Sequence, residues 1–184
     1  MRIIGGEARG RRLMAPDGMD TRPTADKVRE ALFSILINDV PGARVLDLFG
    51  GSGALALEAI SRGASSAVIC DSAQSAIDCI RKNALAVAGE SDRVRVIKGD
   101  YKKALGLLSD RQFELVFLDP PYRMAEAYAE CAKALLANGM LAPEGLIVAE
   151  RRSNVTICWP EGLKRVDQRV YRDTALEFVC EDKA

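Results

Sequence analysis

The sequence predicts a Rossmann-like α/β fold, in which helices cover both faces of a doubly wound, mostly parallel sheet of seven strands. Three observations predict it. Short apolar segments alternate with helical segments from residue 41 onward, a glycine-rich turn follows the first apolar segment, and 48% of the 184 residues are hydrophobic. Strands buried on both faces are apolar throughout, and alternation with helices is typical of parallel sheets.

We expect two parts along the chain: residues 1–40 as an N-terminal extension, and residues 41–184 as the sheet domain. In the extension, two apolar segments within the first fourteen residues flank glycines, which predicts a small hairpin or extended arm. A helix should follow, with Thr24 or Asp26 capping its start. Its apolar positions share one helical face and should dock on the sheet domain. They are Val28, Ala31, Leu32, Ile35 and Leu36.

In the sheet domain, five apolar segments have the length of strands, and glycines follow the helical segments between them. We expect strands at residues 45–49, 67–70, 94–97, 115–118 and 145–149. We expect helices at residues 54–62, 73–87 and 125–138. The end of the chain should form a hairpin of residues 163–170 and 175–179, which adds an antiparallel edge to the sheet.

The composition excludes several kinds of site. Histidine is absent, which removes Ser-His-Asp catalysis and histidine-ligated metal sites. The five cysteines are odd in number and widely spaced, so we expect reduced thiols, no metal and a cytoplasmic protein. Neither a signal peptide nor an apolar run of roughly 20 residues is present, so we expect no membrane partner. We also expect a monomer.

The glycine-rich turn, residues 50–53, follows the first strand of the domain and should bind a ligand at the carboxyl end of the sheet. Its pattern also fits the dinucleotide motif G-x-G-x-x-G/A, and Asp71 follows about 20 residues later. Asp47 counts against a dinucleotide, because its carboxylate would face a pyrophosphate without a compensating cation. A carboxylate there suits a cationic ligand such as the α-ammonium group of S-adenosylmethionine. A plain strand-to-helix turn remains the alternative.

Each of three successive predicted strands ends in a carboxylate, an arrangement typical of methyltransferases. After the second strand, Asp71 can accept hydrogen bonds from both ribose hydroxyls. After the third, Asp100 can accept one from the adenine amino group. We therefore expect S-adenosylmethionine as the cofactor. The predicted cofactor-binding residues are Asp47, Phe49, Gly50, Gly51, Ser52, Gly53, Asp71, Ser72, Asp100 and Tyr101.

The tetrapeptide Asp119-Pro120-Pro121-Tyr122 follows the fourth strand and is the predicted catalytic site. An exocyclic amine on a base is a poor nucleophile, because its lone pair is delocalised into the ring. The Asp119 carboxylate and the Pro120 carbonyl can each accept one N–H, and so favour a pyramidal nitrogen. The prolines hold both acceptors rigid, and Tyr122 can stack on a base taken out of its helix.

Other reactions fit the tetrapeptide less well or equally well. Methylation at C5 of cytosine or uracil needs a nucleophilic cysteine at this strand end, and none is adjacent, since Cys131 lies within the next helix. Methylation of adenine N6 or of a protein glutamine would use the same two acceptors. An NAD-dependent enzyme remains a further alternative for the glycine turn.

The N-terminal extension is rich in arginine and should bind RNA beside the site. A solvated charged arm is the alternative, but a base-modifying enzyme needs phosphate contacts to set its register on the substrate. The predicted RNA-binding residues are Arg2, Arg9, Arg11, Arg12, Arg22, Thr24 and Arg29.

With these residues, the chain resembles the bacterial small-subunit rRNA guanine-N2 methyltransferase family of the RsmD type over nearly its full length. The N-terminal blocks are specific to this family, whereas the glycine turn and the tetrapeptide are shared with many amino-methylating enzymes. Gly50, Ala56, Ser34 and Arg172 depart from the family pattern, which usually has alanine, glycine, asparagine and glycine there. The matching blocks are residues 2–6, 9–11, 22–24, 28–33, 45–49, 51–55, 58–59, 61–63 and 119–122.

The resemblance implies transfer of one methyl group to N2 of a guanine in 16S rRNA, guanine 966 by family resemblance. It also implies small-subunit ribosomal particles as the partner. A non-catalytic rRNA-binding assembly factor stays open as an alternative, although the glycine turn and the tetrapeptide are both intact. Neither the exact nucleotide nor the choice between free RNA and an assembled particle follows from the residues.

Overall fold

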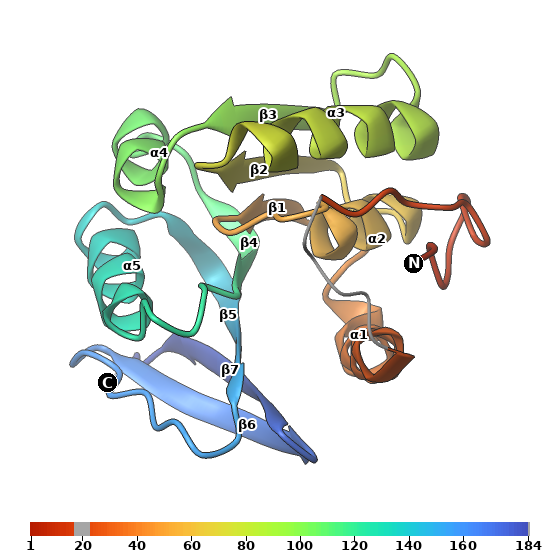
Figure 1. Ribbon diagram of the computed structural model, residues 1–184. Coiled ribbons are helices and arrows are strands. Elements are labelled where there is room, and N and C mark those ends of the chain that lie inside the picture. The colour runs from red at the N-terminus through yellow and green to blue at the C-terminus, as the bar shows by residue number, and fades with distance from the viewer. Residues whose placement is uncertain (17–22, 184) are drawn as a thin grey trace.

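The computed structural model describes residues 1–16 and 23–183, which form one sheet between two layers of helices (Figure 1). The seven strands are ordered β3-β2-β1-β4-β5-β7-β6. The first five strands pair in parallel, and β7 pairs antiparallel with both β5 and β6. Their bounds are β1 Arg44–Asp47, β2 Ser66–Asp71, β3 Val94–Lys98, β4 Phe113–Leu118, β5 Leu141–Arg152, β6 Leu163–Tyr171 and β7 Thr174–Glu181.

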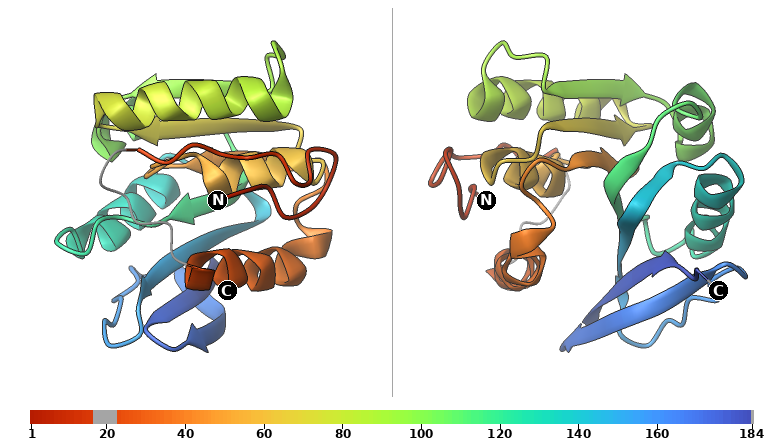
Figure 2. Two further views of the ribbon diagram at one scale, coloured as in Figure 1. Left: turned by 45° about the vertical axis from the view of Figure 1, so that its right-hand side comes forward. Right: turned by 180° about the vertical axis from the view of Figure 1, so that it is seen from behind.

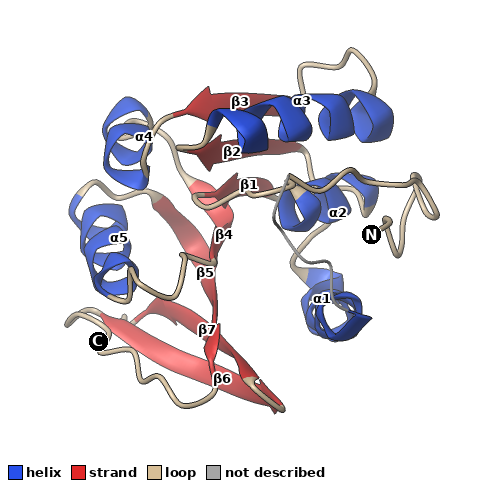
Figure 3. Cartoon of the chain, in the orientation of Figure 1, coloured by secondary structure: helices blue, strands red, loops and turns tan. Residues whose placement is uncertain are grey.

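The helices divide between the two faces of the sheet (Figures 1 and 3). Helices α1, α2 and α3 pack on one face, and α4 and α5 on the other, so that the sheet separates two apolar cores. The predicted doubly wound α/β fold is therefore confirmed. The helices are α1 Pro23–Ile35, α2 Ala54–Ser61, α3 Gln74–Ala88, α4 Tyr101–Leu107 and α5 Glu126–Ala137, and a 3-10 turn, Leu36–Asn38, follows α1.

Helix α4 has no counterpart in the predicted elements. Its start is capped by Asp100, whose carboxylate accepts a hydrogen bond from the backbone N–H of Lys103 at 2.8 Å. Its buried side chains, at positions 101, 104, 105 and 108, have helical spacing. An N-cap residue followed by that spacing was a usable signal, but seven residues are too short to stand out from a loop.

The closing hairpin adds two strands in an order that the sequence does not specify. Its second strand, β7, lies beside β5, and its first strand, β6, forms the edge of the sheet. Because Thr174 pairs with Arg152, the turn of the hairpin lies at the carboxyl end of β5. In that turn Arg172 has φ +54°, a left-handed conformation that explains why glycine is usual at this position in the resembling family.

The first fourteen residues form the predicted hairpin, here called the N-terminal arm, and run along α2 (Figure 2). Arg2 and Arg12 form an antiparallel bridge, and the backbone N–H of Ile3 donates to the carbonyl of Arg11 at 2.9 Å. Ile3 and Leu13 are buried in the core that contains α1 and α2. The arm is thus packed on the sheet domain.

Helix α1 docks through the predicted face, with one addition. Val28, Leu32 and Leu36 are buried as expected, while Phe33 is fully buried as well and its ring centroid lies 6.0 Å from that of Phe117 in β4. None of the helices in the described ranges is long and apolar enough to cross a membrane.

Candidate active site

The strand order reverses between β1 and β4, and the carboxyl ends of these strands carry Asp47 and Asp119. Ligands of open α/β sheets bind in the crevice at such a reversal. Asp47 pairs in register with Phe117, two residues before Asp119, so both carboxylates lie at the same edge of the sheet. Side chains alternate between the two faces of the sheet along a strand. Val45 and Phe117, two residues before Asp47 and Asp119, belong to the core that contains α1, α2 and α3, so both carboxylates project to that face.

The glycine-rich turn is shaped by its contact with β2. The backbone N–H of Gly50 donates to the carbonyl of Cys70 at 2.8 Å. A Cβ atom on Gly50 would lie 2.5 Å from Cγ2 of Ile69, so even alanine would force a shift. This close approach accounts for glycine where the resembling family usually has alanine. Gly51 and Gly53 both have positive φ, which the turn requires.

Asp47 is a buried carboxylate, and none of the arginines or lysines in residues 1–16 and 23–183 forms an ion pair with it. Its Oδ1 accepts a hydrogen bond from the backbone N–H of Phe49 at 3.2 Å. Burial, together with the negative charge of Asp71, raises the pKa of Asp47 to about 7. A bound positive group would favour the ionised form, so the α-ammonium group of S-adenosylmethionine fits this position.

Asp71, at the end of β2, hydrogen-bonds the glycine-rich turn. Its Oδ2 accepts a hydrogen bond from the backbone N–H of Gly51 at 2.9 Å, and its Oδ1 accepts one from Ala73 at 2.9 Å. A carboxylate has about four lone-pair sites, so acceptor capacity remains for ribose hydroxyls. The neighbouring Ser72 is exposed at the same strand end.

The residues predicted to meet the adenine lie at the start of α4. Asp100 is exposed and caps that helix, so one of its oxygens already has a partner. Tyr101 is buried, and its hydroxyl donates to Oε2 of Glu130 at 2.6 Å. Its ring centroid lies 5.5 Å from that of Phe49, which joins the two aromatic residues beside the turn.

The tetrapeptide follows β4 without an intervening residue. Pro120 is buried, while Asp119, Pro121 and Tyr122 are exposed. Among the described residues, no donor binds the Asp119 carboxylate or the Pro120 carbonyl, so both acceptors are available. The pKa of Asp119 is raised by desolvation, and further by the carboxylates of Glu150 and Asp47.

Glu150 is a site residue that the sequence reasoning missed. Asp119 follows Leu118, which pairs with Ala149, so Asp119 and Glu150 occupy neighbouring positions on adjacent strands. Desolvation raises the pKa of Glu150, while the charge of Arg29 opposes the shift. The hydroxyl of Tyr128 donates to the Glu150 carbonyl at 2.5 Å. A carboxylate directly after a predicted strand was the available signal.

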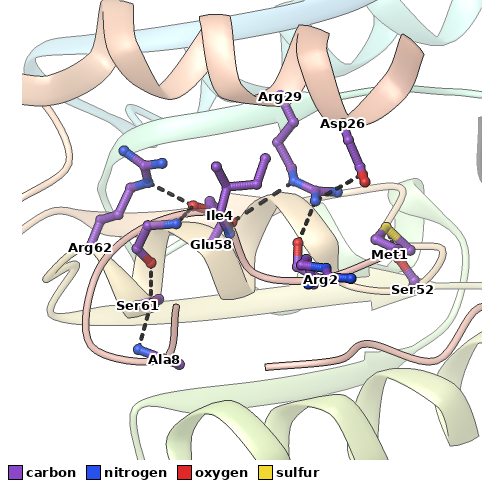
Figure 4. A network of polar contacts seen from close by, with 11 residues as sticks. Met1, Arg2, Ile4, Ala8, Asp26, Arg29, Ser52, Glu58, Ser61 and Arg62 are labelled. Atoms are coloured by element: carbon purple, nitrogen blue, oxygen red, sulfur yellow. Dashed lines mark hydrogen bonds and ion pairs between the residues drawn. The ribbon is translucent and has the colours of Figure 1, made fainter. Parts of the chain in front are cut away.

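The arm is attached to α2 by a buried carboxylate (Figure 4). Glu58 is completely buried and accepts hydrogen bonds from the backbone N–H groups of Ile4 and Gly5, both at 2.8 Å. The Nε of Arg62 donates to the same carboxylate at 2.7 Å. Ser61 adds two bonds, from its hydroxyl to the Gly5 carbonyl and from the N–H of Ala8 to its oxygen.

Arg29 does not take the position predicted for an RNA contact. Its side chain is buried, donates to the carbonyl of Arg2 at 2.7 Å, and pairs with Asp26 at 3.1 Å. Its Nε lies 3.9 Å from Oε2 of Glu58 (Figure 4). Arg29 therefore holds the arm and α1 together, and phosphate cannot reach it.

The other predicted RNA contacts divide into two groups. Arg22 lies outside the described residues, as does the side chain of Thr24. Four arginines of the arm are exposed: Arg2, Arg9, Arg11 and Arg12. Residues 7–12 line a concavity of about 500 Å³, which brings three of these arginines to one surface.

Comparison with known proteins agrees with this arrangement. The family described as Conserved hypothetical protein 95 matches residues 1–180. The ribosomal RNA small subunit methyltransferase D of Escherichia coli K12 is 39% identical over 152 residues, which are 82% of this chain and 74% of that protein. Its namesake in Haemophilus influenzae is 34% identical over 166 residues, 88% of this chain and 83% of that protein.

A solved structure gives the same result for the fold. The Escherichia coli protein yhhF superimposes with a TM-score of 0.84 at 34% identity, and the match covers 99% of this chain and 98% of that one. The resemblance inferred from the motifs is thus confirmed along almost the whole chain. The chain belongs to the family described as Conserved hypothetical protein 95, which includes the ribosomal RNA small subunit methyltransferase D proteins.

Proposed function

We propose that this chain, a methyltransferase dependent on S-adenosylmethionine, methylates N2 of a guanine in 16S rRNA, guanine 966 by family resemblance. The observation that carries the proposal is the pair of available acceptors, the Asp119 carboxylate and the Pro120 carbonyl, beside the buried carboxylate of Asp47. The Asp119 carboxylate and the Pro120 carbonyl can bind an amine, while the Asp47 carboxylate binds a cation.

Four parts of the chain would hold the cofactor, which supplies a methyl group activated by a sulfonium. Asp47 would bind the α-ammonium group, and Asp71 the ribose hydroxyls. The N–H groups and open backbone of residues 50–53 would lie against the amino-acid portion. Phe49 and Tyr101 would provide the apolar wall beside the adenine, with Asp100 at its edge.

Asp119 and Pro120 would activate the guanine amine by binding its two N–H groups in a fixed orientation. Each would accept one N–H of the N2 amino group, which favours a pyramidal nitrogen whose lone pair is no longer delocalised into the ring and is directed toward the methyl group. The N–C bond forms as the S–C bond breaks, and the nitrogen then carries a positive charge. Asp119 accepts the released proton and passes it to solvent. Positioning of this kind contributes up to about 7–11 kcal/mol to a two-reactant step.

The exposed arginines of the arm would bind the RNA backbone. Arg2, Arg9, Arg11 and Arg12 form a basic surface on a hairpin that is itself anchored to α2. Contacts with phosphate set the register of a protein on its nucleic acid without reading sequence. If four arginines engage phosphates, log affinity should fall with log salt at a slope of about −3 to −4.

The test is transfer of a labelled methyl group. The purified chain is incubated with labelled S-adenosylmethionine and with either free 16S rRNA or small-subunit particles, and the products are analysed as nucleosides and peptides by mass spectrometry. We expect N2-methylguanosine at one position. Label in N6-methyladenosine or in a methylated glutamine would replace guanine as the substrate, and absence of any transfer would reject the proposal.

Two variants separate catalysis from binding. Asp119→Asn should abolish transfer and keep affinity for S-adenosylhomocysteine and RNA. Asp110 is exposed in the loop before β4, at the opposite end of that strand, so Asp110→Asn is the matched control and should behave as the wild type. An active Asp119→Asn enzyme would contradict the assigned role, and so would one that binds no cofactor.

A further inference from the structure

We propose that Arg152 is the residue that selects guanine, by donating hydrogen bonds to the O6 and N7 atoms of the target base while Tyr122 stacks on its ring. This inference rests on the proposed function, because it assigns the base whose amine Asp119 and Pro120 receive. It starts from a contact that the cofactor and the amine acceptors do not explain: Cζ of Arg152 lies over the Tyr122 ring, 4.1 Å from the ring centroid.

The two consecutive arginines at the end of β5 have different surroundings. Arg151 is buried, and its Nε donates to Glu177 at 2.6 Å on the face of the sheet that carries α4 and α5. Arg152 is exposed and, by strand alternation, projects to the opposite face. That is the face of Glu150 and Asp119, so Arg152 belongs to the active-site side of the sheet.

Strand pairing and hydrogen bonds fix the backbone of Arg152, and so fix the point from which its side chain extends. The residue pairs with Thr174 in β7, and its carbonyl accepts hydrogen bonds from the N–H of Val155 at 3.1 Å and from Nη1 of Arg151 at 2.9 Å. Within residues 1–16 and 23–183, no carboxylate pairs with the Arg152 guanidinium. Its donors are therefore available to a ligand.

Tyr122 presents an aromatic ring on which a flipped base can stack. It is three residues from Asp119, and 64% of its surface is exposed although it is a large aromatic residue. A base stacked on this ring lies parallel to it, and the guanidinium already rests against the ring. With Cζ 4.1 Å from the ring centroid, the guanidinium occupies the place of a stacked base, so an incoming base would move it aside. At that height above the ring, the displaced fork faces the edge of the base in the plane of that base, as bidentate hydrogen bonding requires.

The chemistry of the base edges makes this contact selective. When N2 of guanine points to Asp119, the edge across the ring presents two acceptors, O6 and N7. Arginine is the side chain that most commonly reads this pair. Adenine has an amino group in place of O6, so two donors would face each other. The same contact thus favours guanine over adenine, and methylation at N2 over methylation at N6.

The test compares guanine with two analogues that carry the same N2 amine. In 2-aminopurine the amine is retained, but O6 and the hydrogen on N1 are absent, whereas 7-deazaguanine lacks only N7. Each is introduced at the target position of 16S rRNA by ligation, and the RNA is used in whichever form, free or assembled, the wild-type enzyme methylates. The measured quantity is kcat/KM for guanine divided by kcat/KM for the analogue.

For the wild type we expect a ratio of about 5 to 150 for 2-aminopurine, the range of one bidentate contact. Arg152→Ala should bring that ratio close to one, by losing activity on guanine and keeping activity on the analogue. Arg152→Lys, which has no planar fork, should lower the ratio as well. Arg111 is exposed in the loop before β4, so Arg111→Ala is the matched control and should retain the wild-type ratio.

Two outcomes would overturn the inference. An unchanged ratio in Arg152→Ala would mean that the arginine does not read the base. An equal loss on both bases, with a salt slope smaller by about 1, would identify a phosphate contact instead. Failure of the proposed function is distinguishable, because the wild type would then methylate no guanine at N2 in any arm of the experiment.

Discussion

Asn83 in α3 hydrogen-bonds the carbonyl of Ser52, in the middle of the glycine-rich turn, at 2.8 Å. The same Nδ2 donates to the carbonyl of Met14 at 3.0 Å, and its Oδ1 accepts from the backbone N–H of Met14 at 2.8 Å. Asn83 is almost fully buried, and its bond to Ser52 is shielded from water. One side chain therefore joins the predicted cofactor turn to the end of the N-terminal arm.

Replacing Asn83 with leucine should weaken both the fold and cofactor binding. The change leaves backbone groups of Ser52 and Met14 without partners, at a cost of roughly 1–3 kcal/mol in the free energy of unfolding. Urea denaturation measures the stability, and calorimetric titration with S-adenosylhomocysteine measures the affinity. Asn138→Leu, at an exposed helix end, is the control. Unaltered affinity in Asn83→Leu would show that the turn keeps its shape without this bond.

Replacing Glu58 with glutamine should detach the arm. The carboxylate accepts two backbone N–H groups of the arm and lies against Arg62 and Arg29, so its neutral form removes the fully buried negative charge that both guanidinium groups face. Breaking a buried pair of this kind costs about 3–5 kcal/mol. We expect a loss of that order in urea denaturation, together with weaker RNA binding.

Glu114→Gln is the matched control for Glu58. Glu114 pairs with Arg44, but both side chains are more than one-third exposed. An exposed pair contributes about 0–1 kcal/mol, so this variant should denature near the wild type. Equal behaviour of the two variants would remove the claim that Glu58 anchors the arm.

The sequence predicts those site features that follow from strand ends. Asp47 and Asp119 could be identified because a parallel sheet brings the carboxyl ends of its strands to one edge. The prediction that Arg29 contacts RNA is wrong because a sequence shows charge but not burial, and the buried guanidinium lies beside Glu58, twenty-nine residues away. The bond between Asn83 and Ser52 spans 31 residues and depends on how α3 packs, which no local pattern encodes.

Arg172 provides a test of backbone strain. Its φ of +54° lies in the left-handed region, where a side chain costs about 1–2 kcal/mol relative to glycine. Arg172→Gly relieves that cost, and the greater freedom of glycine in the unfolded chain offsets part of the gain. We expect a net stabilisation of roughly 0.5–1 kcal/mol in urea denaturation. Arg172→Ala is the control, since it removes the same side chain and keeps the strain.

Protonation of Asp47 should make both stability and cofactor affinity depend on pH. The pKa of Asp47 is about 7 in the folded chain and 3.8 in its ordinary state, so between these values the folded form holds a proton that the unfolded form releases. The stability of the cofactor-free protein should therefore fall as pH rises from about 4 to 7. Asp119 and Glu150, whose pKa values are also raised, act in the same direction.

Cofactor affinity should show the opposite trend over part of this range. The α-ammonium group binds ionised Asp47, so affinity for S-adenosylhomocysteine should rise between pH 5.5 and about 7.5. At more alkaline pH the ligand's own ammonium group loses its proton, and affinity should then decline. Calorimetric titration across this range checks the curve. Asp47→Asn should bind weakly with a flatter rise, and an unchanged rise would assign the titration to another group.

Tyr122 should contribute through its ring and not through its hydroxyl. The residue is exposed and lies beside the two amine acceptors, so its substitution should leave the fold intact. Stacking of a base on an aromatic side chain contributes about 1–3 kcal/mol, which corresponds to about 5- to 150-fold in kcat/KM. We expect a loss of that order in Tyr122→Ala and near wild-type activity in Tyr122→Phe, with affinity for S-adenosylhomocysteine unaltered in both. If Tyr122→Phe were as impaired as Tyr122→Ala, the hydroxyl would be the functional group.

The contact between Arg152 and the Tyr122 ring should make the effects of the two residues non-additive. The double variant Tyr122→Ala with Arg152→Ala should therefore lose less activity, as the free energy calculated from kcat/KM, than the sum of the two single losses.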